Sequence, residues 1–259
     1  MIIFERSRAI TSAITTAGLL LIWQLVVWIS AAPPYILPAP WDVLGAWWAH
    51  AGLLLDHARV TIIEIVVGLI LGLMLGVASA LMLTYFRPVR RWMLPLLVVS
   101  QALPVFALAP LLVLWLGYGL ASKIAMAVLI IYFPVTAACY DGLRHTPQYW
   151  LDLAATMDAS ALAVLRHIRL PGALPSLASG VRVATAVAPI GAVVGEWVGS
   201  SAGLGYLMLH ANARMQVDLM FAALITLAVF AVALYFAMDA ILKRLLHWQP
   251  DTTSPTAED

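Results

Sequence analysis

The sequence predicts an all-α membrane protein with about six transmembrane helices, and three observations lead to that fold class. Hydrophobic residues make up 63% of the chain and charged residues only 10%, whereas about a quarter of the residues are charged in an average soluble domain. Apolar runs close to the thickness of a bilayer recur along the chain. Basic residues are distributed unevenly between the segments that join these runs.

Six apolar runs qualify as transmembrane helices: residues 11–31, 60–85, 93–116, 119–140, 176–199 and 217–241. Residues 1–10 then form an N-terminal segment, residues 11–248 a single transmembrane domain, and residues 249–259 a polar, acidic tail that we expect to be disordered. The first run follows Arg6 and Arg8, which is also the pattern of a cleaved secretory signal. Because this run is long enough to cross a bilayer, we favour six spans over the five that cleavage would leave.

The basic residues predict the orientation. With the N-terminus in the cytoplasm, the cytoplasmic segments contain Arg6, Arg8, Arg87, Arg90, Arg91, Arg144, Arg166, Arg169, Lys243 and Arg244, and the outer segments contain Arg59, Lys123 and Arg214. This asymmetry follows the positive-inside rule, so we expect both termini and residues 141–175 in the cytoplasm. A net charge of +1 gives no basic surface for nucleic acid. The single cysteine, Cys139, excludes a disulfide within the chain.

Residues 141–175 form the longest interruption between the apolar runs and read DGLRHTPQYWLDLAATMDASALAVLRHIRLPGALP. Apolar residues at helical spacing predict a first amphipathic helix; they are Trp150, Leu153, Ala154 and Met157. A second stripe, formed by Leu162, Leu165 and Ile168, follows the candidate N-caps Asp158 and Ser160 and ends before Pro171 and Pro175. Two short amphipathic helices between membrane spans indicate a docking surface for a soluble partner.

Residues 152–160 (DLAATMDAS), followed by Ile168, Leu170 and Pro171, resemble the Glu-Ala-Ala loop of ABC-importer membrane subunits. That loop reads Glu-Ala-Ala, three residues, Gly-Ala-Ser, and then Ile-x-Leu-Pro after a short helix. Asp152 takes the Glu position, and Asp158 stands where the family has Gly. Glycine would permit a left-handed turn there, and aspartate is among the few residues that tolerate one. The coupling residues implied by the resemblance are Asp152, Leu153, Ala154, Met157, Asp158, Ala159, Ser160, Ile168, Leu170 and Pro171.

The resemblance implies the type I importer permease fold in a bacterial inner membrane, with the loop inserted into a groove on an ATPase subunit. It also implies two ATPase subunits, a second copy of this chain and an extracytoplasmic substrate-binding protein as partners. No cofactor is expected in the chain itself, because ATP would bind the ATPase subunits. The sequence agrees with a non-catalytic subunit, since it contains no G-x-x-x-x-G-K-[ST], H-E-x-x-H or G-x-S-x-G motif and no Cys/His cluster for a metal.

Small residues in two runs predict close helix packing. Gly68, Gly72 and Gly76 lie at four-residue spacing, which lets a neighbouring helix approach the backbone, either from the same chain or from a second copy. In the fifth run, Pro189 is expected to kink the helix, and Pro189, Ala192 and Glu196 are candidates for the translocation path or a gate. A structural hydrogen bond to the following loop is the alternative for Glu196.

Two further residues of the runs are charged. Glu64 is an ionisable group at membrane depth. Arg182, near the inner end of the fifth run, is expected to extend to the cytoplasmic headgroups.

Two short sequence motifs indicate one branch of this permease family. LPAP at residues 37–40 and SAGLGY at residues 201–206 resemble the nitrate, sulfonate and taurine branch of these permeases. Residues 188–224 also resemble permeases for thiamine-pyrimidine precursors and for riboflavin. We favour a thiamine-pyrimidine precursor such as hydroxymethylpyrimidine as the solute, with riboflavin, a sulfonate, taurine or nitrate as alternatives. A self-contained secondary transporter fits less well, because the sequence shows no internal repeat and its ionisable residues cluster toward the ends of the spans.

Overall fold

The computed structural model describes the backbone of residues 2–248 and the side chains of residue 11 and residues 14–248. Every regular element in that range is a helix, so the predicted all-α class is confirmed. The helices belong to two compact units. Unit 1 contains the described residues up to Val60 together with Ala202–Ala228, and unit 2 contains Thr61–Ser201 and the described residues from Val229 onward. The tail of residues 249–259, for which disorder is expected, lies outside the described residues.

Unit 1 consists of α1 (Ile2–Ser30), α2 (Pro40–Ala49), the first turns of α3 (Ala51–Tyr85), α10 (Leu204–Ala213) and the first turns of α11 (Val217–Leu245). Helix α2 begins at Pro40. A proline at this position removes no helical hydrogen bond, because the first N–H of a helix has no partner within it. The indole Nε1 of Trp47 donates to Thr226 Oγ1 at 3.0 Å and connects α2 to α11. Gly203 has a φ of 113°, a backbone conformation that favours glycine, at the turn before α10.

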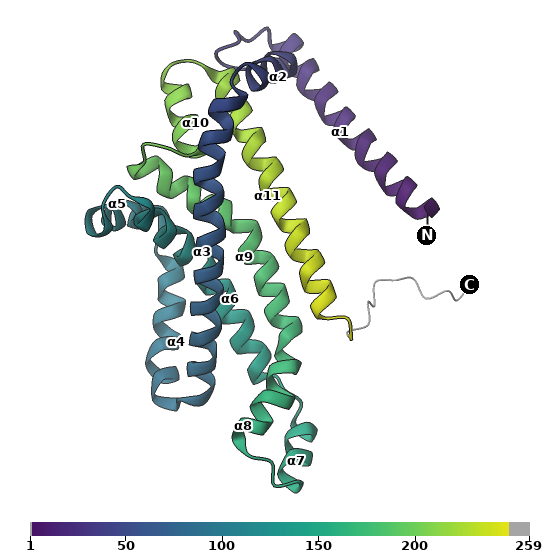
Figure 1. Ribbon diagram of the computed structural model, residues 1–259, viewed down its shortest axis with the longest axis vertical. Helices are drawn as coiled ribbons and strands as arrows, with labels where there is room; N and C mark the ends of the chain where they lie inside the picture. The colour runs from purple at the N-terminus through teal and green to yellow at the C-terminus, as the bar shows by residue number, and fades with distance from the viewer. Residues whose placement is uncertain (1, 249–259) are drawn as a thin grey trace. The chain divides into compact units, whose positions relative to one another are not determined.

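Unit 2 consists of the rest of α3, α4 (Arg87–Ala102), α5 (Val105–Leu116), α6 (Leu120–Arg144), α7 (Gln148–Thr156), α8 (Ala161–Val164), a π-helical turn (Leu165–Arg169), α9 (Leu170–Gly199) and the rest of α11. Figure 1 shows α6 and α9 side by side along their lengths, with α7 and α8 at the end where the chain passes from one to the other. The two helices α6 and α9 contact each other extensively.

Four of the predicted spans are continuous helices that are long and apolar enough to cross a membrane: α3, α6, Ala161–Gly199 and α11. The third predicted span, residues 93–116, is divided instead into α4 and α5, which meet at a bend of 105°. A proline disfavours helical backbone in the residue before it, and Leu103, which precedes Pro104, is extended. The first predicted span coincides with α1, whose described apolar part, Ile14–Ser30, is shorter than the roughly 20 residues of a typical span.

Helix α6 is packed against backbone on two sides, and glycines make this possible. A Cβ atom placed on Gly68, Gly72 or Gly76 of α3 would lie 2.5–2.7 Å from a side-chain carbon of α6. The helix that packs against the three glycines of α3 is therefore α6 of the same chain. On the other side, Gly191 of α9 faces the backbone of Ala127, where an added Cβ would lie 2.8 Å from the Ala127 Cα atom.

The unit 2 core lies where α3, α6 and α9 meet. Cys139 of α6 is buried there with Ala80 and Leu83 of α3 and Ala173 of α9. Between α3 and α6, the hydroxyl of Tyr132 donates to Ser79 Oγ at 2.8 Å. Hydrogen bonds and close packing are the forces that hold helices together in lipid, where burial of apolar side chains gives little advantage.

Replacing Gly72 with alanine tests this packing. The new Cβ would lie 2.5 Å from Ile131 Cγ2, so α3 and α6 must separate. We expect the substitution to destabilise the protein by about 1–3 kcal/mol, a typical cost of overpacking. Gly52→Ala, on the same helix but facing open space, is the matched control and should leave stability unchanged or slightly higher. The measurement is the thermal unfolding midpoint in detergent, and equal midpoints for the two variants would contradict the packing.

Candidate functional site

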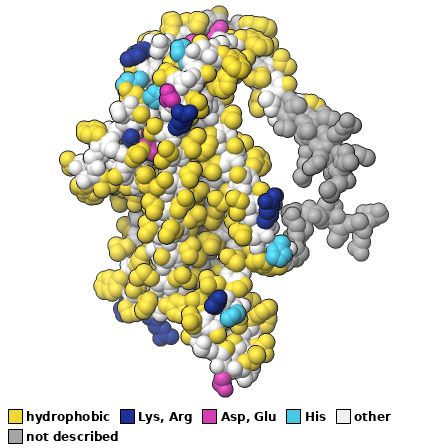
Figure 2. Space-filling model, viewed as in Figure 1, with side chains coloured by type: hydrophobic (Ala, Val, Ile, Leu, Met, Phe, Trp, Pro, Cys, Tyr) yellow, Lys and Arg dark blue, Asp and Glu magenta, His cyan; other side chains and the backbone are white. Residues whose placement is uncertain are grey.

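The predicted docking segment contains one short helix, α7, with apolar side chains that the rest of the described chain does not cover. Leu153 and Met157 are 60% and 74% exposed, and Trp150 is half exposed. Asp152 is also exposed and accepts a hydrogen bond from Gln148 Nε2 at 3.0 Å. Ala154, on the other side of the helix, is buried. Figure 2 shows hydrophobic side chains over most of the visible face, including this end of unit 2. Helix α7 thus presents an apolar surface with the Asp152 carboxylate beside it.

The turn after α7 explains the aspartate at position 158. Asp158 has a φ of 49°, so the left-handed conformation expected from the sequence is present. The Ala159 N–H donates to the Ala154 carbonyl at 3.0 Å and the Asp158 N–H to the Ala155 carbonyl at 3.1 Å. This pair of bonds is the Schellman motif, in which the left-handed residue after the helix is usually glycine. Asp158 is therefore the C-terminal stop of α7 and not an N-cap of the next helix.

The second predicted short helix is not a separate element. Ser160 is its N-cap, as predicted, because its Oγ accepts a hydrogen bond from the Ala163 N–H at 3.3 Å. The chain then continues from α8 through the π-helical turn directly into α9, so the expectation that Pro171 and Pro175 end the helix is wrong. A π-turn inserts an extra residue and opens the backbone, which allows Pro171 to follow without breaking the helix.

This continuous helix is anchored on the core of unit 2. Leu165, in the π-turn, and Leu170, at the start of α9, pack against the cluster of α3, α6 and α9 that contains Cys139. Ile168 and Pro171 are half-buried. The residues predicted for the docking loop therefore divide into two groups: an exposed group on α7, and a group after Ser160 that packs toward the membrane-spanning helices.

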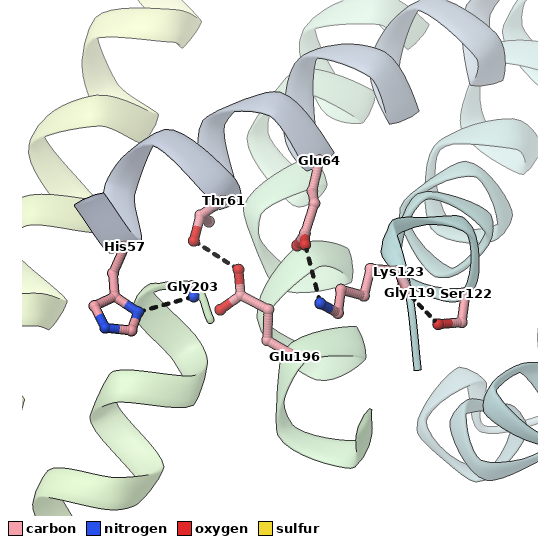
Figure 3. Close-up of polar contacts among 8 residues, drawn as sticks. All are labelled: His57, Thr61, Glu64, Gly119, Ser122, Lys123, Glu196 and Gly203. Carbon is pink, nitrogen blue, oxygen red and sulfur yellow. Dashed lines mark hydrogen bonds and ion pairs between the residues drawn. The ribbon is translucent and has the colours of Figure 1, made fainter. Parts of the chain in front are cut away.

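The predicted gate residues lie inside the packed core, at the end of α9 away from the loop. Ala192 and Glu196 are 0% and 1% exposed, and Pro189 is buried. The hydroxyl of Thr61, on α3, donates to Glu196 Oε1 at 2.6 Å (Figure 3). Thr61 was missed by sequence reasoning, because a threonine in an apolar run gives no signal until its partner helix is known.

A buried ion pair lies next to this hydrogen bond. Lys123 Nζ of α6 is 3.5 Å from Glu64 Oε1 of α3, and both side chains are almost fully buried (Figure 3). The sequence identified Glu64 as ionisable at membrane depth but placed Lys123 among the charges of an outer segment. In the structure, Lys123 lies in the first turn of α6 and points into the protein. Three ionisable side chains thus meet between α3, α6 and α9.

Comparison with known proteins identifies the class of membrane protein. The family described as "Binding-protein-dependent transport system inner membrane component" matches residues 68–247. The chain belongs to this family. It is a multi-pass inner-membrane permease, the non-catalytic membrane subunit of an ABC importer.

The similarity between this permease and its relatives extends over almost the whole chain. A probable ABC transporter permease protein of Haemophilus influenzae is 59% identical over 239 residues, covering 92% of this chain and 98% of the relative. The formylaminopyrimidine transport permease ThiX of Halalkalibacterium halodurans is 36% identical over 87% of this chain and 92% of its own. The riboflavin transport system permease RibX of Chloroflexus aurantiacus is also 36% identical, over 91% of this chain and 89% of its own.

A solved structure supports the fold. Inward-facing MetNI, a methionine ABC transporter, matches with a TM-score of 0.61 at 18% identity, over 80% of this chain and 98% of the matched chain. The predicted type I importer fold is thereby confirmed.

A second ion pair of the permease corrects the expectation for Arg182. Its Nε donates to Asp239 Oδ1 of α11 at 2.7 Å, and Lys243 Nζ lies 2.8 Å from the other oxygen of Asp239. Arg182 therefore binds a neighbouring helix instead of extending alone to the headgroups. Because Asp239 lies 57 positions from Arg182 in the sequence, no local pattern predicts this pair.

Proposed function

We propose that this permease imports a thiamine-pyrimidine precursor such as hydroxymethylpyrimidine, delivered by an extracytoplasmic binding protein and driven by two ATPase subunits. The observation that carries the choice of solute is the 36% identity with the formylaminopyrimidine permease ThiX over 87% of this chain. That relative carries a substituted pyrimidine by its name, and hydroxymethylpyrimidine belongs to the same chemical class. Riboflavin is the second candidate, because RibX has the same identity over a similar length.

The exposed apolar surface of α7 is the proposed ATPase-docking site. Trp150, Leu153 and Met157 form a stripe that no other part of the described chain covers, outside the helices long enough to span a membrane. Helix-in-groove binding uses an apolar stripe of this kind. The excess of basic residues in this loop and near both chain termini supports a cytoplasmic location for them, on the side of ATP. Asp152, beside the stripe, then supplies a charge that fixes the orientation of docking.

Movement of the loop is transmitted by α9. Since α8, the π-turn and α9 form one helical stretch from Ala161 to Gly199, a displacement at the ATPase reaches the far end of the spans without passing through a flexible joint. Leu165 and Leu170 pack the start of this stretch against the core. Arg182 connects the stretch to α11 by its ion pair with Asp239. Rigid-body movement of packed helices is an established form of such coupling.

The solute path lies between two identical copies of the permease. Helices α3, α6 and α9 contact one another at glycines so closely that no solute fits among them. Pro189, Ala192 and Glu196 are buried in that contact and act in gating through helix packing, without touching the solute.

Asp152→Lys tests the docking site. The reversed charge should weaken ATPase docking, and we expect uptake to fall roughly tenfold, the effect of losing about 1.4 kcal/mol of interaction free energy. Asp56→Lys is the matched control, because Asp56 is also an exposed carboxylate and its ion pair with the exposed Arg59 contributes little energy. Uptake and ATP hydrolysis are measured on the same reconstituted complex. Normal uptake by Asp152→Lys would exclude the docking role.

Titration of the substrate-binding protein that delivers solute to this permease tests the solute. We expect hydroxymethylpyrimidine to bind at least ten times more tightly than riboflavin or taurine in calorimetry, since ten-fold corresponds to about 1.4 kcal/mol. Preference for riboflavin would select the second candidate. Preference for taurine or another sulfonate would contradict both, while leaving the assignment as an importer permease intact.

A further inference from the structure

Four polar side chains are buried together where α3 passes the ends of α6 and α9 that lie away from the docking loop. Thr61 and Glu64 lie one turn apart on α3, Lys123 in the first turn of α6, and Glu196 in the last turn of α9 (Figure 3). Their exposed fractions are between 0% and 4%. Such groups are costly in a membrane protein and mark functional positions by default.

The charges of this cluster do not balance. Glu64 and Glu196 are both acids, and among the described residues of unit 2 the base that lies with them is Lys123, whose Nζ is 3.5 Å from Glu64 Oε1 (Figure 3). Helix α5, which also packs against α6 and α9, carries no ionisable residue. If all three groups were ionised, the cluster would hold one surplus negative charge, and an uncompensated buried charge is strongly unfavourable.

The hydrogen bonds distinguish the two carboxyl groups. Glu196 Oε1 accepts a short hydrogen bond, 2.6 Å, from the Thr61 hydroxyl, which stabilises a carboxylate. Glu64 has no hydrogen-bond donor at either oxygen among the described residues, although it is fully buried. The ion pair that Glu64 forms within the described chain is with Lys123, whose Nζ lies 3.5 Å from Oε1, an ion-pair distance without hydrogen-bond geometry. Glu64 is thus the group on which the surplus charge is least stabilised.

We propose that this cluster is a proton-binding site, in which Glu64 holds one proton while α3 is packed against the ends of α6 and α9. The proton is taken from the medium as the helix ends close, and it neutralises the surplus charge. The closed cluster then contains one ammonium, one carboxylate and one neutral carboxylic acid, with a total charge of zero. When the helix ends separate, water reaches Glu64 and the proton returns to the medium.

The site makes the packing of the three helices dependent on pH. Protonated Glu64 stabilises the closed arrangement, so this contribution is present at low and neutral pH and is lost as the pH rises far enough to remove the proton. Glu64→Gln resembles the protonated form and removes that dependence. The inference concerns side chains of this chain alone and holds whichever solute the permease carries.

Infrared spectroscopy of the full-length permease in lipid nanodiscs tests the site at neutral pH. A protonated carboxylic acid has a C=O stretching band separate from the bands of carboxylates. We expect this band in the wild type, its loss in Glu64→Gln, and no change in the exposed control Asp56→Asn. Absence of the band in the wild type, or its persistence in Glu64→Gln, would overturn the proposal.

Two further measurements keep the test decisive. The unfolding midpoint of the wild type should fall from neutral to alkaline pH more steeply than that of Glu64→Gln, and parallel curves would contradict proton binding at Glu64. If Glu64→Gln does not fold, Glu64→Asp retains the acid and should shift the band, because the shorter side chain changes its surroundings. An unshifted band in Glu64→Asp would show that the proton is held elsewhere.

Discussion

The close approach of α6 to α3 on one side and to α9 on the other is the constraint on which the rest of unit 2 depends. Lipid chains are as apolar as leucine, so helices in a membrane gain little from burying apolar side chains against each other. Gly72 of α3 and Gly191 of α9 instead let α6 approach at the distance of backbone contact. That approach encloses Cys139 and brings Lys123 beside Glu64. Without it, the buried charges would lose their partners.

The same packing would connect the proposed docking loop mechanically to the far end of α9. Helix α9 has 30 residues, a length of about 45 Å at 1.5 Å per residue. One end of it continues from the loop, and the other carries Glu196. Because Leu170 binds α9 to its neighbours at the loop end and Arg182 binds it to α11 near its middle, a displacement of the loop would move α9 together with these helices. The proposed proton site lies at the opposite end of α9. Separation of the helices there would expose its ionisable side chains to water.

Local patterns in the sequence were sufficient for the apolar runs, the stripe on α7 and the left-handed turn at Asp158, since each depends on neighbours within a few residues. They were not sufficient where distant helices meet. The pairing of Lys123 with Glu64 and that of Arg182 with Asp239 depend on which spans pack together, and no short-range spacing encodes this. The π-turn before Pro171 was missed for a similar reason: Leu165 and Leu170 keep the helix continuous through contacts with α3 and α6. The bend at Leu103 had a local cause in Pro104, but the continuous hydrophobicity of residues 93–116 concealed it.

The reactivity of Cys139 tests the packing of α3, α6 and α9 most directly. It is the only cysteine of the chain and is 1% exposed in the core that these helices share. A fluorogenic maleimide added to the folded permease in detergent should leave Cys139 unmodified until the protein unfolds cooperatively on heating. A cysteine introduced at the exposed Met157 should react at once and serves as the reference. Reaction of Cys139 in the folded wild type as fast as a cysteine at position 157 would contradict the close packing of the three helices.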